Sequence, residues 1–257
     1  MKYVALLTVV AIITIIILKS SAAAAVPTLA SSRQLIVVIS DSWNSPKASL
    51  YRIERRNTGW SRPLSRSDVV VGSNGMAWGI GLLPKNRDGL MKKEGDRRAP
   101  AGIFHLKHAM GYAPAAPEGA TYPYEQISKV SRCIDDPASA LYNRIVNKGE
   151  MGAQNGVPWK SAEVMLRKDN LYKWLIVVDH NMTAPLAGAG SCIFLHIWRS
   201  PEKGTAGCTA MAEEDLLALF GWLRNEKNPL LVQLPRAEYE RVWKAWGLPP
   251  LAQLEAP

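Results

Sequence analysis

The chain is a succession of short apolar, β-branched runs separated by segments rich in glycine, proline and charge. Residues 34–39 and 174–179 are almost continuously apolar, which is typical of strands buried on both faces. The clearest helices are expected over 213–225 and 236–246, where apolar side chains recur at i, i+3, i+4 and i+7. Because short strands dominate, the pattern predicts an α+β, β-dominated fold, with a mixed sheet or sandwich and peripheral helices.

Weaker signals complete the expected architecture. Two further short helices are expected over 135–146, which begins with Asp-Asp-Pro, and over 161–171. The chain has 257 residues, of which 47% are hydrophobic, enough for one sizeable core, or for a core with a small satellite, but not for several domains. Further short strands are expected over 49–55, 67–72, 101–106, 191–198 and 230–234.

The N-terminus has the pattern of an export signal. Lys2 precedes an uncharged apolar run over 3–18, and a run of alanines then supplies the small residues that a signal peptidase needs. We therefore expect a signal peptide over 1–25, cleaved near its end, and a linker over 26–33. A full membrane span needs about 20 apolar residues, so the run is short for an anchor, and an uncleaved anchor remains the alternative. The expected location is the periplasm or cell envelope, with membrane contact through this segment alone.

The charge of the chain bears on its partners. The formal net charge is +9, and removing Lys2 and Lys19 with the signal leaves +7. A basic exported protein suits an anionic partner, although a generic solvated surface accounts for the same charge. The sequence has no long block of Lys and Arg and no basic motif interleaved with aromatic residues. Nucleic acid is therefore not an expected partner.

The expected strand over 191–198 carries a histidine on a mixed face. Alternate side chains of a strand point to opposite faces, so Ile193, Leu195 and Ile197 share an apolar face that should meet the core. His196 lies on the other face, beside aromatic residues and Cys192. A cleft could form on that second face, beside His196.

Cys208 follows His196 after a loop that could return the chain opposite the histidine. The thiolate, not the thiol, is the nucleophile, and a histidine within about 3 Å can remove the thiol proton. We therefore expect Cys208 as nucleophile and His196 as base. Gly207 lets a substrate carbonyl approach the backbone, and N–H groups around Gly207 and Thr209 are candidates for an oxyanion hole. A core histidine with a buried thiol is the alternative.

The chain has three cysteines, and an odd number in an oxidising compartment suggests one disulfide and one free thiol. Cys192 lies four residues from His196, roughly 13 Å along a strand, which is too far for proton transfer. Cys133 has no histidine near it in the sequence. Cys133 and Cys192 are therefore candidates for a disulfide, and each could instead be an ordinary buried thiol.

Two sequence blocks resemble the YkuD-type L,D-transpeptidases. Ile-Phe-Leu-His, ending at His196, precedes Thr-Ala-Gly-Cys, ending at Cys208, and Gly-Asp at 95–96 precedes Ala-Pro-Ala-Gly-Ile-Phe at 99–104. The spacer after the histidine is short, and Ala206 stands where many members have a second histidine, so the resemblance is to a divergent, short-spacer branch. It implies a YkuD-like catalytic domain over residues 34–234, followed by a C-terminal helix and tail over 235–257.

The resemblance also implies a reaction. Such an enzyme attacks a peptidoglycan stem peptide, releases its terminal D-residue and holds the acyl group as a thioester on Cys208. Transfer to an amine makes a transpeptidase, and transfer to water makes a carboxypeptidase or hydrolase. Thr205 is then a candidate for orienting the loop or the imidazole, and Arg199 for binding a stem-peptide carboxylate. The family needs neither metal nor cofactor, and we expect a monomer.

Three other functions are compatible with the sequence: a metal site, a serine acyl-transferase and a non-catalytic binding module. His180, Cys192, His196 and Cys208 could bind a metal, but their spacing lacks the usual paired ligands. Ser200 and Lys203 match the Ser-x-x-Lys motif of penicillin-binding proteins, but its partner motifs are missing. A cell-wall-binding module without turnover is the third. Asp135, Asp136 and Trp159 are polar or aromatic residues that the sequence does not place in the cleft.

Overall fold

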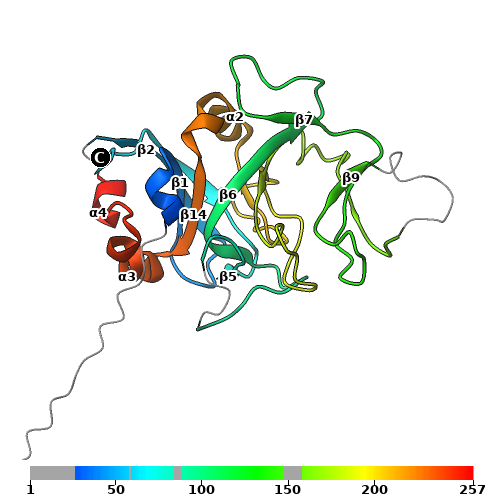
Figure 1. Ribbon diagram of the computed structural model, residues 1–257, viewed down its shortest axis with the longest axis horizontal. Coiled ribbons are helices and arrows are strands. Elements are labelled where there is room, and N and C mark those ends of the chain that lie inside the picture. Colours follow the sequence, from blue (N-terminus) through cyan, green and yellow to red (C-terminus); the bar gives the residue numbers. More distant parts are fainter. Residues whose placement is uncertain (1–26, 58, 84–87, 148–157, 257) are drawn as a thin grey trace, which may run out of the picture.

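The computed structural model describes residues 27–57, 59–83, 88–147 and 158–256 (Figure 1). The expected signal peptide over 1–25 lies outside the described residues. Most of the segment expected to be a linker is part of the fold instead, because it forms the short helix α1 (Pro27–Ser31), which buries Leu29 in the core. None of the described helices has the length and apolar character that crossing a membrane requires.

A large mixed sheet dominates the described residues, which confirms the expected β-dominated α+β class (Figure 1). The sheet closes on itself, because β1 (Gln34–Ser40) pairs in parallel with β14 (Leu230–Pro235) and antiparallel with β2 (Lys47–Arg56). Closure removes the open edges of these strands. The path from β14 back to β2 runs through β6 (Ala99–Gly111), β11 (Trp174–Val178), β12 (Phe194–Ile197), β13 (Thr209–Met211) and β4 (Ser65–Val70).

Short strands extend this sheet at its margins. β3 (Gly59–Trp60) pairs with β2, while β5 (Met76–Trp78) and β7 (Tyr124–Gln126) both pair in parallel with β6. β6 is the longest strand and crosses the middle of the molecule (Figure 1). Its length lets one strand pair with β14, β11, β5 and β7, so β6 organises the sheet around the main core.

The helices cover the sheet with apolar faces. α2 (Glu213–Trp222) packs on β11 and β12, and η2 (Asn225–Lys227) leads from it to β14. α3 (Arg236–Trp246) has the bounds expected from its periodicity, and it ends at Gly247 in a left-handed conformation (φ 71°) that glycine adopts readily. The expected C-terminal tail is part of the fold, because α4 (Leu251–Leu254) buries its leucines in the main core beside α3 (Figure 1).

A second, three-stranded sheet lies far from α3 and α4 (Figure 1). It consists of β10 (Glu163–Val164), β8 (Ser131–Cys133) and β9 (Ile145–Asn147). The helices expected over 135–146 and 161–171 are therefore wrong. Asp136 caps a turn instead, since its carboxylate accepts the N–H groups of Ala138 (2.9 Å) and Lys160 (2.7 Å). The Asp-Asp-Pro sequence that suggested a helix start thus forms a turn through the Asp136 side chain. The residues of β9 and β10 are extended because they pair with β8.

The strand expected over 191–198 is shorter than predicted. β12 begins at Phe194, because Cys192 takes a left-handed conformation (φ 56°) that ends the extended chain. The two-faced alternation is nevertheless present: Ile193 and Leu195 pack in the main core, whereas Cys192 and Phe194 belong to a second core with Cys208. β12 and β13 run parallel, and their register sets His196 beside Ala210, two residues after Cys208.

Candidate active site

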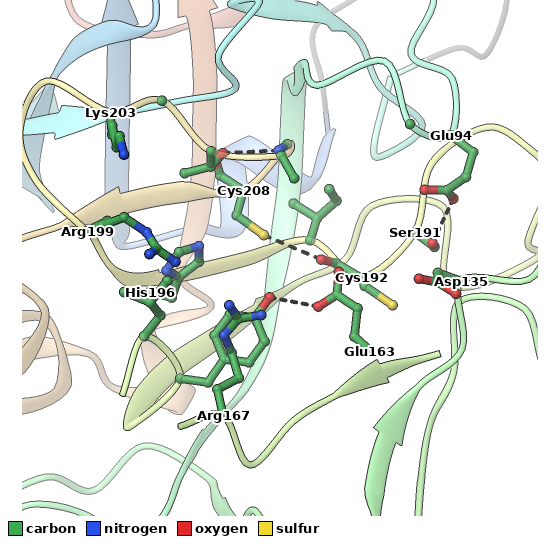
Figure 2. Close-up of a pocket in the computed structure, with 18 of the residues that line it drawn as sticks. Glu94, Asp135, Glu163, Arg167, Ser191, Cys192, His196, Arg199, Lys203 and Cys208 are labelled. Atoms are coloured by element: carbon green, nitrogen blue, oxygen red, sulfur yellow. Dashed lines mark hydrogen bonds between the residues drawn. The ribbon is translucent and has the colours of Figure 1, made fainter. Parts of the chain in front are cut away.

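Cys208 and His196 line the same cavity, of about 420 Å³ (Figure 2). β12 supplies His196, and Cys208 ends the loop that leads into β13. Arg199, Thr205 and Gly207 also line the cavity. Thr209 is absent from the lining, because its side chain is buried and its hydroxyl donates to Gln233 Oε1 (2.5 Å). The cavity therefore collects most of the residues that the motif singled out, from segments adjacent in the sheet.

The Cys208 thiol is held by backbone groups. Its S–H donates to the carbonyl oxygen of Cys192 (3.4 Å), and Sγ accepts the N–H of Phe194 (3.4 Å). Figure 2 shows the sulfur directed toward Cys192, with the imidazole of His196 on another side of the cavity. An N–H aimed at Sγ favours the thiolate, so the backbone of β12 is arranged to receive negative charge there.

The imidazole of His196 has a defined tautomer. Nδ1 lies 2.7 Å from the carbonyl oxygen of Ile197, and a carbonyl can only accept, so Nδ1 carries the proton. Nε2 then keeps a lone pair that can accept a proton. The ring of Tyr172 packs edge-on against the imidazole, with centroids 5.3 Å apart, and holds its plane. His196 thus has the protonation state that a general base requires.

Burial keeps both groups neutral. It raises the pKa of the Cys208 thiol to about 12, and the negative charge of Glu163 adds to that rise. Burial likewise lowers the pKa of His196 to about 4. A thiol with a raised pKa beside an imidazole with a lowered pKa does not form a standing thiolate–imidazolium pair at neutral pH. The arrangement favours proton transfer during attack rather than before it.

Thr205 shapes the turn that precedes the cysteine. Its hydroxyl donates to the carbonyl oxygen of Cys208 (2.6 Å) and accepts the N–H of Gly207 (3.0 Å). Of the two roles expected for Thr205, the contacts correspond to orienting the loop and not the imidazole. The same bond corrects the expectation for Gly207, because an N–H that is used inside the turn is not free to bind an oxyanion.

Cys133 and Cys192 form a disulfide, and Cys208 is the free cysteine among the described residues. The bond joins the small sheet to the segment just before β12. Cys192 also donates its N–H to Asn143 Oδ1 (2.9 Å), and this amide in turn donates to the carbonyl oxygens of His180 and Asn181 (2.8 Å each). The left-handed backbone of Cys192 is therefore fixed by one covalent and several polar contacts.

Opposite charges line two sides of the cavity (Figure 2). On the side of His196, Arg199 donates to Asp169 Oδ2 (3.0 Å) but leaves much of its guanidinium in solvent. On the far side, Oδ1 of Asp135 is buried and has no hydrogen-bond partner within the described part of the chain. The basic side chains on the first side are Arg167, Arg199 and Lys203, and the acidic ones on the far side are Glu94, Asp135 and Glu163. Lys92, which is also basic, lines the cavity as well.

Several of these residues were missed by sequence reasoning. Glu163 and Arg167 lie in a segment expected to be helical, and Lys92 and Glu94 in a segment read as a charged turn. The Gly-Asp motif at 95–96 was the one signal that pointed to this turn. Of the three residues that the sequence left unplaced, Asp135 lines the cavity, whereas Asp136 and Trp159 are not in its lining.

The rival sites find little support in these contacts. Cys192 is oxidised in the disulfide and cannot serve as a thiolate ligand with His180, His196 and Cys208. The described residues contain no group of three or more His, Cys, Asp and Glu suited to a metal ion. Ser200 is not among the residues that line the cavity, although Lys203 is.

The fold and the cavity define a β-dominated domain built around a free cysteine and a histidine. The chain belongs to the L,D-transpeptidase catalytic domain family, YkuD, whose model matches residues 42–232. Among solved structures, the chain is similar to the helical cell shape determining protein Pgp2 from Campylobacter jejuni, with 12% identity and a TM-score of 0.34. That match covers 79% of this chain and 48% of the other, so the chain spans about half the length of that protein. No curated protein matches the sequence.

Proposed function

We propose that this protein is an exported L,D-transpeptidase that acts on peptidoglycan stem peptides through a thioester on Cys208. The observation that carries the proposal is the cavity that Cys208 shares with a His196 whose Nε2 is free to accept a proton. Membership of the YkuD family supports the substrate class. The apolar run over residues 3–18 supports export to the cell envelope, where that substrate lies.

The first half-reaction transfers the donor acyl group to sulfur. The S–H of Cys208 turns from the Cys192 carbonyl toward His196 Nε2, which takes the proton as Sγ attacks the stem-peptide carbonyl. The N–H of Cys208 is the oxyanion donor on this wall, because that of Gly207 is bonded to Thr205. Collapse of the intermediate breaks the peptide bond, and His196 returns the proton to the departing amine of the D-residue.

The second half-reaction releases the enzyme. An acceptor amine loses a proton to His196 and attacks the thioester carbonyl, which forms an amide and regenerates the thiol. Charges on the two sides of the cavity suit such substrates: Arg199 and Lys203 can bind a carboxylate, and the unpartnered oxygen of Asp135 can bind an ammonium group. With water as acceptor, the same steps make an L,D-carboxypeptidase.

The test incubates the purified protein with tetrapeptide muropeptides and follows the products by mass and chromatography. Cys208→Ala is the inactive variant, and Ser200→Ala is the control for the rival serine motif. A cross-linked or exchanged product, made by wild type and Ser200→Ala but not by Cys208→Ala, is expected. Loss of the D-residue to water alone identifies the carboxypeptidase. If wild type and Cys208→Ala are equally inert while both bind cell wall, the protein is a binding module and the proposal fails.

A further inference from the structure

Lys92 is a buried lysine in the wall of the active-site cavity. Only 6% of its surface is exposed, and it lies among the residues that line the cavity with Cys208 and Gly207. Lysine is among the residue types least often buried, because removing an ammonium ion from water is costly unless it is paired. A buried lysine in this wall is therefore unusual, and no step of the proposed reaction uses Lys92.

Asp96 holds the ammonium group in place. Lys92 Nζ donates to Asp96 Oδ1 (2.7 Å) and to the carbonyl oxygen of Lys93 (3.3 Å). The carboxylate of Asp96 is itself anchored, since it accepts the backbone N–H of Lys93 (2.8 Å) and of Arg98 (2.9 Å). The positive charge consequently has a fixed position rather than the freedom of a surface lysine. Asp96 belongs to the Gly-Asp motif of the sequence.

The fixed charge faces the turn before the nucleophile. A Cβ atom on Gly207 would lie 3.5 Å from Lys92 Nζ, so the glycine leaves no side chain between the ammonium group and this turn. Gly207 also has φ 154°, a conformation that residues with a side chain rarely adopt. Because the Gly207 N–H is bonded to Thr205, this turn lacks one of the dipoles expected to stabilise negative charge. Lys92 stands where a compensating charge is needed.

Several other groups act on Cys208 from the elements around it. Glu163 on β10 opposes the thiolate, while Arg167 and the N–H of Phe194 favour it. Tyr172 and His196 are further titratable groups in this cavity, and both are buried and neutral near pH 7. Glu94, Asp135, Arg199 and Lys203 line the same cavity. Lys92 acts in the same direction as Arg167 and lowers the pKa of the thiol against the effect of burial. It does so from a fixed position next to Gly207, the residue that precedes the proposed nucleophile.

We propose that Lys92, held by Asp96, supplies the fixed positive charge that stabilises negative charge at the Gly207–Cys208 turn. The charge favours the Cys208 thiolate and then the oxyanion of the tetrahedral intermediate. The second part rests on the proposed function, and the first does not. The alternative is a purely structural role, in which the Lys92–Asp96 ion pair only holds the loop in place. The experiment must distinguish these two roles.

The test measures how fast the full-length protein reacts with iodoacetamide at Cys208 at pH 8, by intact mass. Iodoacetamide is uncharged, so the removal of a lysine does not change its attraction to the cavity. Lys92→Met and Lys92→Gln remove the charge, and the glutamine keeps a hydrogen-bonding group for Asp96. Lys92→Arg keeps the charge. Lys93→Met is the matched control, because it makes the same charge change at an exposed neighbour.

A charge at close range shifts a pKa by about 1 unit or more. Each unit lowers the thiolate fraction tenfold, and the greater nucleophilicity of the remaining thiolate reduces the net effect to about threefold. We expect alkylation to slow about threefold or more in both neutral variants and to stay within about twofold of wild type in Lys92→Arg and Lys93→Met.

The inference is overturned if a folded neutral variant reacts as fast as wild type, or if Lys92→Arg is slowed as much as Lys92→Met. Folding is checked by circular dichroism, and Lys92→Gln keeps the test decisive if the methionine variant does not fold. Alkylation needs no substrate, so this result and the muropeptide assay fail independently. A slowed neutral variant of a protein without muropeptide activity would support the charge effect and reject the transpeptidase.

Discussion

The carbonyl oxygen of Cys192 accepts the hydrogen bond of the Cys208 thiol (3.4 Å), while the side chain of Cys192 is bonded to Cys133. Cys192 is thus both one of the two disulfide-bonded cysteines and a contact of the proposed nucleophile. Cys192 has a left-handed backbone, which the disulfide helps to fix. The bond therefore serves the geometry of the site as well as the stability of the small sheet.

Replacing Cys133 and Cys192 together by alanine should affect stability and activity. The disulfide spans 59 residues, and a loop of that length is worth about 4 kcal/mol in the chain-entropy model. We expect urea unfolding to show a loss of about 2–5 kcal/mol and muropeptide turnover to fall at least about tenfold where the protein is still folded. Unchanged turnover in the folded double variant would mean that the Cys192 carbonyl is held without the disulfide.

The free energy of unfolding should decrease as the pH is lowered, because His196 is buried as a neutral group. Its pKa is lowered to about 4 in the folded protein, so between the ordinary value of about 6.5 and 4 only the unfolded state binds the proton. The favourable contribution is complete above pH 6.5 and is lost as the pH falls through this window. From pH 7 to pH 5, His196 should account for about 2 kcal/mol of lost stability.

His196→Gln tests this prediction by urea unfolding at both pH values. His180 is also buried, with its pKa lowered to about 3, and contributes equally to both proteins. The loss between pH 7 and pH 5 should therefore be smaller in the variant by about 2 kcal/mol, whatever its stability at pH 7. Equal losses in the two proteins would show that His196 is protonated in the folded state.

Thr205→Val should disorder the turn before the nucleophile. The change keeps the shape but removes the hydroxyl that donates to the Cys208 carbonyl (2.6 Å) and accepts the Gly207 N–H (3.0 Å). We expect a stability loss of about 1–3 kcal/mol and a larger relative loss of turnover, at least about tenfold. Thr205→Ser keeps the hydroxyl and should retain most activity. Full activity in Thr205→Val would show that the hydroxyl is not needed, and equal losses in both variants would show that the methyl group matters as well as the hydroxyl.

The sequence allowed the main elements of the fold to be predicted where local pattern and burial agree. β1 and β11 are buried along their whole length, and α3 has a regular apolar face, so their periodicity is unambiguous. The small sheet was mistaken for helices because its pairing is non-local. Its strands are two or three residues long, and their path is fixed by the Cys133–Cys192 disulfide and by the hydrogen bonds of the Asp136 side chain. The periodicity of apolar residues gives no information about such non-local bonds.

The site was predictable only where its residues are close in the sequence. His196 lies on β12 and Cys208 directly precedes the adjacent parallel strand β13, so a short loop brings them into one cavity. Lys92 and Glu163 reach the same cavity from distant segments, through strand pairings in the closed sheet and in the small sheet that no local pattern predicts. The oxyanion role expected for Gly207 failed for a related reason, because the bond from its N–H to Thr205 depends on the closed turn.

Glu163→Gln should make Cys208 more reactive, the opposite of the change expected at Lys92. The carboxylate of Glu163 raises the pKa of the thiol, and it accepts the hydroxyl of Tyr172 (2.7 Å), a bond that glutamine can keep. Burial raises the pKa of Glu163 itself, so the reaction is measured at pH 8 rather than at a lower pH, because the higher pH favours the ionised carboxylate. We expect iodoacetamide to react about threefold faster or more for each unit by which the pKa of the thiol falls. Tyr172→Phe is the control for loss of that hydrogen bond, since it removes the bond and leaves the carboxylate in place. An equal acceleration there would assign the effect to loosened packing rather than to the charge of Glu163.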